Sequence, residues 1–501
     1  MNIRRINFFL FVAVAVIAVQ TILNQALFRD LWFDEALTFL NFAMLPDIAA
    51  IYKNFVIPNN QILFTVFLKY WSFYDPGLMM PDLHMRLLSL IFAGSSLAVI
   101  YSWHRYFSRC AVILTAVALA LSLPFEIYAV ALRAYMLSLF LLLLCISIAF
   151  RIERTANWRY YVAYFFASLA AVAALPSNIV ALGGIALWFI PLRKTTKQQK
   201  LDWLMLAVLP ILAMALFYIP LTRQLRMILA LREGWNNGFC AAIAFYAAFG
   251  LSFLPLLITV RSQKTLSLLK TFAVIMLPLP FFLLRTPAPF PRIFFPYWAV
   301  LVLPLLSFLN LFLARNRHHK MVYPALAGAV LIWAIGMNVF RTELSNILTP
   351  QGAMDDYFYP SYARPNFQPH NTIRLLLKQY CNNLPPIYVS FDADFYPLIF
   401  YGHLNGINPE LWRFDNPHGK VESLPSNALV ILSSSEHELK NFSERFGVHP
   451  TFLFSSGFHR VYQLKKKVTT KNTKKAQSTQ RELVFVHEWL EWSFDNINQN
   501  P

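Results

Sequence analysis

The residues best suited to chemistry are two adjacent carboxylates, Asp34 and Glu35, in an aromatic segment that also contains Trp32 and Phe33. They directly follow an apolar run, residues 7–27, that is long enough to cross a bilayer. Ionisable side chains at the edge of a membrane are costly to desolvate and mark functional sites. A carboxylate held there could act as a general base on an attacking hydroxyl.

A structural alternative is that Asp34 caps a helix that begins at Glu35, since Asp is a good N-cap residue. The rest of the chain favours the functional interpretation. Neighbouring side chains on a helix point about 100° apart, so the two carboxylates cannot both face one hydroxyl. We expect Asp34 to be the base, because it lies at the helix start beside Trp32 and Phe33.

Arginines predicted to lie on the same side of the membrane could hold an anionic group: Arg86, Arg133, Arg223, Arg226, Arg232, Arg285 and Arg292. Arg133 and Arg292 are best placed, since each lies at the outer mouth of a predicted span beside aromatic residues. The planar guanidinium binds phosphate oxygens in pairs. The alternative is that these side chains only extend toward lipid headgroups. His84 and His403 are isolated and are interpreted as structural or solvated.

Composition identifies a membrane protein. Of 501 residues, 57% are hydrophobic and 14% are charged, whereas soluble domains carry roughly 25% charged residues. The net charge of +18 does not indicate nucleic-acid binding, because the basic residues cluster in short loops between apolar runs. The four cysteines are far apart and form no CxxC pair, so neither a zinc site nor a disulfide framework is predicted. No nucleotide-binding motif is present.

About eleven spans are predicted, near residues 7–27, 85–103, 110–125, 130–150, 159–175, 177–192, 202–221, 239–260, 271–284, 294–314 and 321–340. Lys and Arg clusters fall in alternate loops, which places those loops and the N-terminus in the cytoplasm. The first run, preceded by Arg4 and Arg5, is predicted to be a retained signal anchor. Asp34 and the C-terminal part are then extracytoplasmic in a cell (inner) membrane.

The first outer loop, residues 28–84, is amphipathic. Residues 43–57 and 61–74 are predicted to be helices in the membrane interface, as are residues 222–231, and together to roof a cavity.

The overall fold prediction is a polytopic α-helical membrane domain (1–341) and a small extracytoplasmic α/β domain (342–464). Strands are predicted at residues 387–391, 428–432 and 461–464, and helices at residues 371–380 and 436–446. Residues 465–501 are predicted to be a disordered basic tail with a short amphipathic helix.

Several local segments resemble, in their order along the chain, those of the GT-C glycosyltransferases, in particular bacterial relatives of protein O-mannosyltransferases and lipid A aminoarabinose transferases. The matching segments are Leu31-Trp32-Phe33-Asp34-Glu35-Ala36, Asn59-Asn60-Gln61-Ile62-Leu63-Phe64, Met85-Arg86-Leu87-Leu88-Ser89, Ile127 to Tyr135, and Pro291-Arg292-Ile293-Phe294-Phe295-Pro296.

The resemblance implies a polyprenyl-phosphate sugar donor, an extracytoplasmic acceptor (lipid A core, polysaccharide or protein), and inverting transfer with Asp34 as base. It implies that Arg133, Arg292 and Arg86 hold the phosphate. It also implies that Trp32, Asn60, Gln61, Tyr128 and Tyr135 line the substrate cavity. Gln61 stands where relatives often have His, which argues against a metal or phosphate role at that position. Arg133 stands where the aminoarabinose branch has a second carboxylate, which indicates a different sugar or acceptor. No metal ligands are assigned, and dependence on a divalent metal stays open.

Two other functions fit parts of the pattern. A transporter or flippase for a polyprenyl lipid would also need an apolar cavity with outward arginines, but it would not need a fixed carboxylate pair, and no inverted repeat is visible. An enzyme similar to an O-antigen polymerase is the third possibility. The residues do not specify the sugar or the acceptor.

Overall fold

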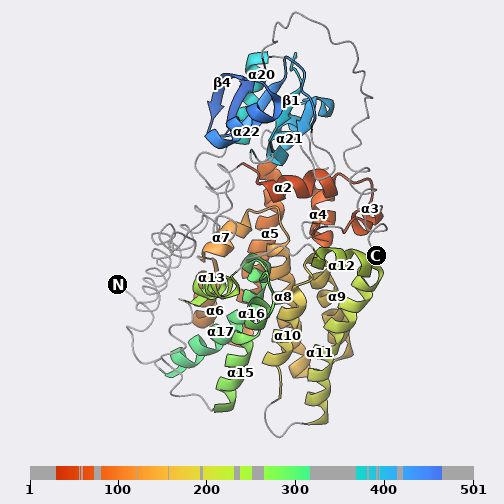
Figure 1. Ribbon diagram of the computed structural model, residues 1–501. Coiled ribbons are helices and arrows are strands. Elements are labelled where there is room, and N and C mark those ends of the chain that lie inside the picture. Colours follow the sequence, from red (N-terminus) through yellow and green to blue (C-terminus); the bar gives the residue numbers. More distant parts are fainter. Residues whose placement is uncertain are drawn as a thin grey trace, which may run out of the picture. The chain divides into compact units, whose positions relative to one another are not determined.

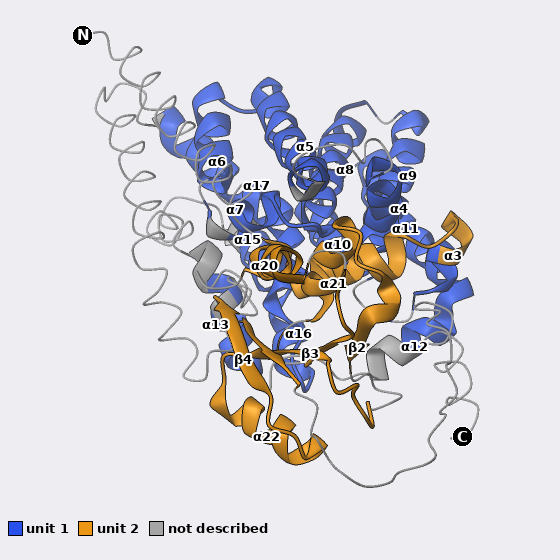
Figure 2. Cartoon of the chain, turned by 90° about the horizontal axis from the view of Figure 1, so that it is seen from above, with its two compact units in different colours: residues 1–28, 51–359 blue, residues 29–50, 360–501 orange. Residues whose placement is uncertain are grey.

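The structure is a computed structural model that describes residues 30–55, 57, 60–72, 81–120, 122–155, 157–191, 196–230, 237–250, 265–315, 368–380, 383–390, 393, 395–414, 421–457 and 459–464. The chain divides into two compact units, coloured separately in Figure 2. The helical unit comprises residues 1–28 and 51–359, and the α/β unit comprises residues 29–50 and 360–501. The predicted spans 7–27 and 321–340 and the predicted tail 465–501 lie outside the described residues.

The helical unit contains the elements labelled α4 to α17 in Figure 1. Their bounds are α4 Ile62–Ser72, α5 Pro81–Ser102, η2 Trp103–Arg105, α6 Arg109–Ala120, α7 Leu123–Ala129, α8 Tyr135–Thr155, α9 Trp158–Ala174, α10 Asn178–Trp188, α11 Lys197–Tyr218, η3 Ile219–Leu221, α12 Thr222–Ala230, α13 Gly238–Gly250, α15 Thr265–Met276, α16 Leu279–Leu284, η5 Pro291–Tyr297 and α17 Trp298–Arg315.

Helix α8 is the centre of this unit. Most of its side chains are buried, and it packs against α5, α9, α10 and α17. A helix that is apolar on all sides is suited to such a central position. Among the described residues, four stretches are helical, long and apolar enough to cross a membrane: Leu83–Arg105, Tyr135–Thr155, Lys197–Arg226 and Pro291–Ala314.

The predicted spans 110–125 and 130–150 have the wrong limits. The run 110–125 is divided between α6 and α7, because Pro124 occupies the first turn of a new helix. The run 271–284 coincides with the apolar helical stretch Leu269–Leu284, which has a short turn before α16, whose N-cap is Pro278. The run 130–150 starts too early, because α8 begins only at Tyr135. Residues 130–134 instead form a bend that carries Arg133.

Helices are present in all three segments that were predicted to be interfacial, although one differs in extent. Helix α4 matches the predicted 61–74, and α12 matches the predicted 222–231. The predicted helix 43–57 is wrong in extent, because the α-helix there, α3, spans only Ile48–Lys53. The Asp47 carboxylate accepts a hydrogen bond from the Ala50 N–H (2.7 Å), so this helix has a capped start after Pro46.

The α/β unit is built on a five-stranded mixed sheet of order β2-β1-β3-β5-β4. The strands are β1 Ile387–Val389, β2 Trp412–Phe414, β3 Leu429–Ser433, β4 Thr451–Ser456 and β5 His459–Gln463. Strand β1 pairs in parallel with both β2 and β3, whereas β5 pairs antiparallel with β3 and β4.

Three longer helices accompany the sheet: α20 Pro369–Tyr380, α21 Phe395–Leu404 and α22 Glu436–Phe446. The described structure contains helices at the predicted 371–380 and 436–446, and the predicted strands coincide with β1, β3 and β5. Helix α21 and strands β2 and β4 were not predicted. Helix α21 is largely apolar on every side, so its sequence has no helical periodicity to detect.

Residues 29–50 also belong to the α/β unit. They include the acidic helix α2, Phe33–Thr38, and the π-helix η1, Phe39–Ala43, which continues from it. Helix α2 packs on α21. No sequence pattern indicated that this segment and the C-terminal residues form one compact unit.

Candidate functional site

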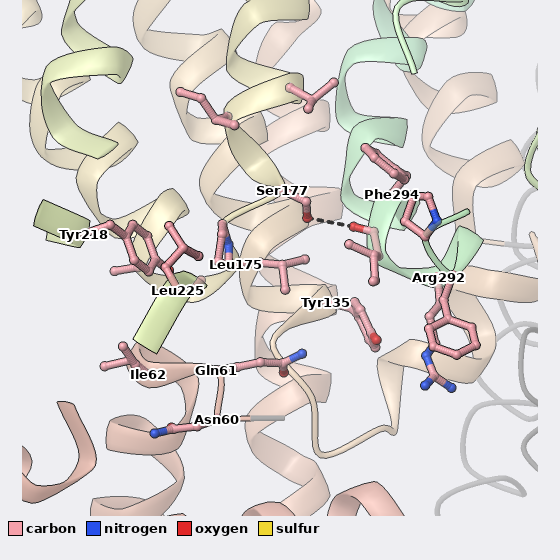
Figure 3. Close-up of a pocket in the computed structure, with 18 of the residues that line it drawn as sticks. Asn60, Gln61, Ile62, Tyr135, Leu175, Ser177, Tyr218, Leu225, Arg292 and Phe294 are labelled. Carbon is pink, nitrogen blue, oxygen red and sulfur yellow. Dashed lines mark hydrogen bonds between the residues drawn. The ribbon is translucent and has the colours of Figure 1, made fainter. Parts of the chain in front are cut away.

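The helical unit encloses a cavity of about 390 Å³, within the size range of small-molecule sites. Its lining residues come from the starts of α4, α8 and α10, the ends of α9 and α11, and the segment around η5. Figure 3 shows Asn60 and Gln61 on one side of this cavity and Arg292 and Phe294 on the other. Most of the lining is apolar, with side chains such as Ile62, Leu175 and Phe281.

Three arginines line the cavity: Arg133, Arg285 and Arg292. None of the described lining residues is Asp or Glu. The N-termini of α8 and α10 also lie at the cavity, and the positive ends of their dipoles favour a nearby anion. An anionic headgroup attached to an apolar chain would match this distribution of charge and apolar surface.

The bend that carries Arg133 is fixed by buried polar side chains from the start of α4 and from α5. The Ala134 N–H donates to Gln61 Oε1 (2.5 Å), which ties the bend to the start of α4. On α5, Ser89 Oγ donates to the Ala131 carbonyl (2.5 Å) and Arg86 Nη1 donates to the Val130 carbonyl (3.4 Å). Residues 130–134 are not helical, so their buried backbone N–H and carbonyl groups need hydrogen-bond partners from side chains. The bend therefore has one defined conformation.

Arg292 is held at the opposite wall by η5. Its guanidinium carbon lies 4.7 Å from the centroid of the Phe290 ring, a cation–π arrangement. Ser177 Oγ, at the start of α10, donates to the Ile293 carbonyl (3.0 Å), the bond dashed in Figure 3. Arg285, one of the candidate arginines of the sequence, also lines the cavity. Ser177 lines it too but was not chosen from the sequence, because a single serine has no distinctive pattern.

The structure brings five residues chosen from the sequence to this cavity: Asn60, Gln61, Arg133, Tyr135 and Arg292. Asn60 is anchored by its amide, which donates to the carbonyls of Ile51 (2.8 Å) and Asn54 (2.9 Å).

Two further chosen residues of this unit are not among those lining the cavity. Tyr128 packs behind Tyr135, with ring centroids 4.5 Å apart. Arg86 is fully buried and contacts the bend from behind.

The acidic pair lies in the α/β unit, on α2. The alternative that Asp34 is an N-cap is wrong, because α2 begins at Phe33 and its N-cap is Trp32. Glu35 has the capping task instead: its Oε2 accepts a hydrogen bond from the Trp32 N–H (3.0 Å), and the side chain is fully buried. Asp34 keeps 9% of its surface exposed, and Trp32 keeps 7%.

One of the two isolated histidines is packed against a tryptophan, and the other is exposed to solvent. His84 stacks on Trp71 (5.3 Å between centroids) and its ring contacts the Trp71 carbonyl (3.1 Å), while His403 is exposed. Within the described ranges, no three His, Cys, Asp or Glu side chains are grouped closely enough to hold a metal ion.

The chain was compared with family models, curated proteins and solved structures, and only solved structures are similar to it. No family model and no curated protein sequence matches the chain. Among solved structures, ArnT from Cupriavidus metallidurans in the apo state has a TM-score of 0.52 at 14% sequence identity, covering 90% of this chain and 97% of ArnT. ArnT bound to undecaprenyl phosphate also has a TM-score of 0.52 at 14% identity, covering 92% of this chain and 99% of that one.

The chain shares the fold of ArnT. This agrees with the resemblance inferred from the ordered sequence segments, and the apolar helices identify a polytopic membrane protein. An oligosaccharyltransferase from Archaeoglobus fulgidus is also similar over 91% of this chain and 73% of its own, at 13% identity, but its TM-score of 0.40 supports no conclusion. At 14% identity the shared property is the fold, and a fold alone does not determine a function.

Proposed function

We propose that the protein is an inverting glycosyltransferase that moves a sugar from a polyprenyl-phosphate carrier to a hydroxyl of an extracytoplasmic acceptor. The observation that carries this proposal is the cavity of the helical unit, where three arginines and two helix N-termini face a largely apolar space without a described carboxylate. The GT-C fold and the undecaprenyl phosphate bound by ArnT support a lipid-phosphate donor.

The arginines provide the chemistry that the leaving group needs. When the bond from the sugar to phosphate breaks, the departing polyprenyl phosphate keeps its negative charge and needs no proton. Guanidinium groups bind such oxygens through charge-assisted, paired hydrogen bonds. Arg133 and Arg292 are proposed to make these contacts, with Arg285 as a third cation of the same cavity.

The acceptor side of the reaction needs a base. The acceptor oxygen must lose a proton as it attacks the anomeric carbon, and we assign that proton to the Asp34 carboxylate. Glu35 is less suited, because its carboxylate is fully buried and already accepts the Trp32 N–H. Direct displacement by the acceptor oxygen inverts the anomeric configuration.

The proposal places the protein in the cell (inner) membrane with the N-terminus in the cytoplasm and the reaction on the outer side. This orientation rests on the Lys and Arg distribution in the loops. The acceptor is an extracytoplasmic glycan, lipid or protein.

The test is a donor-cleavage assay on the purified full-length protein in detergent. Undecaprenyl-phosphate sugars are incubated with and without extracts containing envelope glycans, and released undecaprenyl phosphate is measured, with EDTA in a parallel series for metal dependence. Release that depends on the extract supports the transferase. Binding of the donor without any release, for every sugar and extract, contradicts it and is the result a lipid transporter would give.

A further inference from the structure

The acidic helix needs an external support. Helix α2 has only six residues, Phe33–Thr38, and a helix this short does not keep its conformation without tertiary contacts. It forms one compact unit with residues 360–501, although most of the chain separates them in sequence. The direction in which Asp34 points is therefore set by what α2 packs on.

That support is helix α21. At the start of the segment, the Leu31 N–H donates to the Tyr401 hydroxyl (2.8 Å) in a buried hydrogen bond. Beyond α2, Asn41 Nδ2 donates to the Tyr396 hydroxyl (2.9 Å). Between these two bonds, the Phe33 ring lies edge-on to the Tyr396 ring, with centroids 5.0 Å apart. Two tyrosines of one helix thus hold both ends of the acidic segment.

Tyr401 is itself rigidly placed. Only 1% of its surface is exposed, and its ring stacks on His370 of α20 with centroids 4.9 Å apart. The His370 N–H donates to Asp30 Oδ2 (3.0 Å), which adds a second bond beside that of Leu31. The Tyr401 hydroxyl therefore lies at a fixed point at the start of the acidic segment.

We propose that α21 is the platform that orients Asp34 and that Tyr401 is a positioning residue for the transfer reaction. The inference rests on the proposed function, because it takes Asp34 as the base. Leu31 immediately precedes the N-cap Trp32, so its anchored N–H fixes where the first turn of α2 begins. A displacement of about 1 Å in a reacting group can lower a rate about 10²-fold.

The experiment compares full-length wild type with Tyr401→Phe, which removes only the hydroxyl. Hydrogen exchange of peptides covering residues 30–38 is followed by mass spectrometry, and kcat and donor KM are measured in the cleavage assay. We expect exchange near Leu31 to accelerate on the order of tenfold and kcat to fall on the order of tenfold, with donor KM unchanged. Tyr462→Phe is the matched control, because Tyr462 is a buried tyrosine of strand β5 in the same unit.

The outcomes separate the inference from the proposed function. Unchanged exchange in Tyr401→Phe overturns the platform, and faster exchange with unchanged kcat overturns the positioning role. A rise in donor KM with kcat unchanged also overturns it. If the wild type cleaves no donor, the proposed function fails, whereas the exchange result still decides the platform. Should Tyr401→Phe not fold, Tyr396→Phe tests the same platform through peptides covering Asn41.

Discussion

Asp34 and Glu35 are neighbours in the sequence but have different surroundings. Glu35 is fully buried and its carboxylate closes the first turn of α2 by accepting the Trp32 N–H. Asp34 is the second residue of α2, so it is not the N-cap. The Trp32 N–H donates to Glu35 and not to Asp34. A conservative amide substitution at each position should therefore affect different properties.

Asp34→Asn should leave expression and folding near normal, because the two side chains have the same shape. Transfer should fall by about 10²–10⁴-fold, the usual effect of losing a general base. Donor binding should persist, since the proposed phosphate ligands are arginines and not carboxylates. Glu35→Gln, which keeps an acceptor for the Trp32 N–H, is the matched control and should reduce transfer less. The measurements are donor cleavage and donor affinity, and a fully active Asp34→Asn enzyme would refute the assignment.

Arg133→Lys and Arg292→Lys keep the charge but lose the planar fork that binds two phosphate oxygens. Each should raise the donor KM about tenfold, while membrane insertion stays normal. Arg159→Lys is the control, because Arg159 is an exposed arginine at the start of α9 and does not line the cavity. Wild-type donor KM in both cavity variants would favour the alternative that these arginines only reach toward lipid headgroups.

At the scale of elements, the site is made where helices end. The bend at residues 130–134 separates α7 from α8 and presents Arg133, while η5 presents Arg292 before α17 begins. The backbone groups freed at such breaks are available for side chains from other helices, as Gln61 shows by accepting the Ala134 N–H. Interrupted helices thus provide both the polar groups and their fixed positions.

In the α/β unit, His459 joins three elements. Its ring contacts Thr372 Oγ1 of α20 (3.0 Å) and the Ala393 carbonyl beyond β1 (3.1 Å), and it lies on β5. Burial lowers the pKa of His459 to about 4, although the Ala393 carbonyl partly opposes this. Below pH 6.5 the unfolded state binds a proton that the folded state excludes until about pH 4.

Stability of this unit should therefore fall as the pH is lowered, by about 2 kcal/mol between pH 7 and pH 5 from His459 alone. His459→Gln should show a smaller loss over that interval, because the amide cannot take up the proton. The measurement is the difference in thermal unfolding temperature of the full-length protein in detergent at the two pH values. An equal difference in wild type and variant would show that His459 does not control this pH dependence.

At the scale of the whole molecule, the Lys and Arg distribution predicts that the α/β unit is extracytoplasmic. A reporter enzyme that is active only outside the cytoplasm should therefore be active when fused after Gln463. The same reporter inserted in the basic loop after Arg193 should be inactive, which provides the control. A cytoplasmic signal after Gln463 would mean that a span was miscounted and would contradict the proposed orientation.

The sequence by itself determined the local and compositional features. Long apolar runs identified a membrane protein because backbone groups in lipid must be paired within a helix. The order of short motifs supported a resemblance to the GT-C glycosyltransferases, and the helix predicted at residues 436–446 coincides with α22. The cavity residues Arg133 and Arg292 were also named from the sequence, because charged residues at the ends of apolar runs are easily recognised. Gln61 and Tyr135 were named through the resemblance of their segments to a known family.

Only the tertiary structure decided which of these residues meet and what holds them. The bond between Leu31 and Tyr401 joins residues 370 positions apart, and that between Gln61 and Ala134 joins residues 73 apart. Neither pair has a local pattern, because a hydrogen bond depends on distance and direction in space and not on spacing along the chain. For the same reason, the identity of the true N-cap of α2 and its packing on α21 required the folded structure.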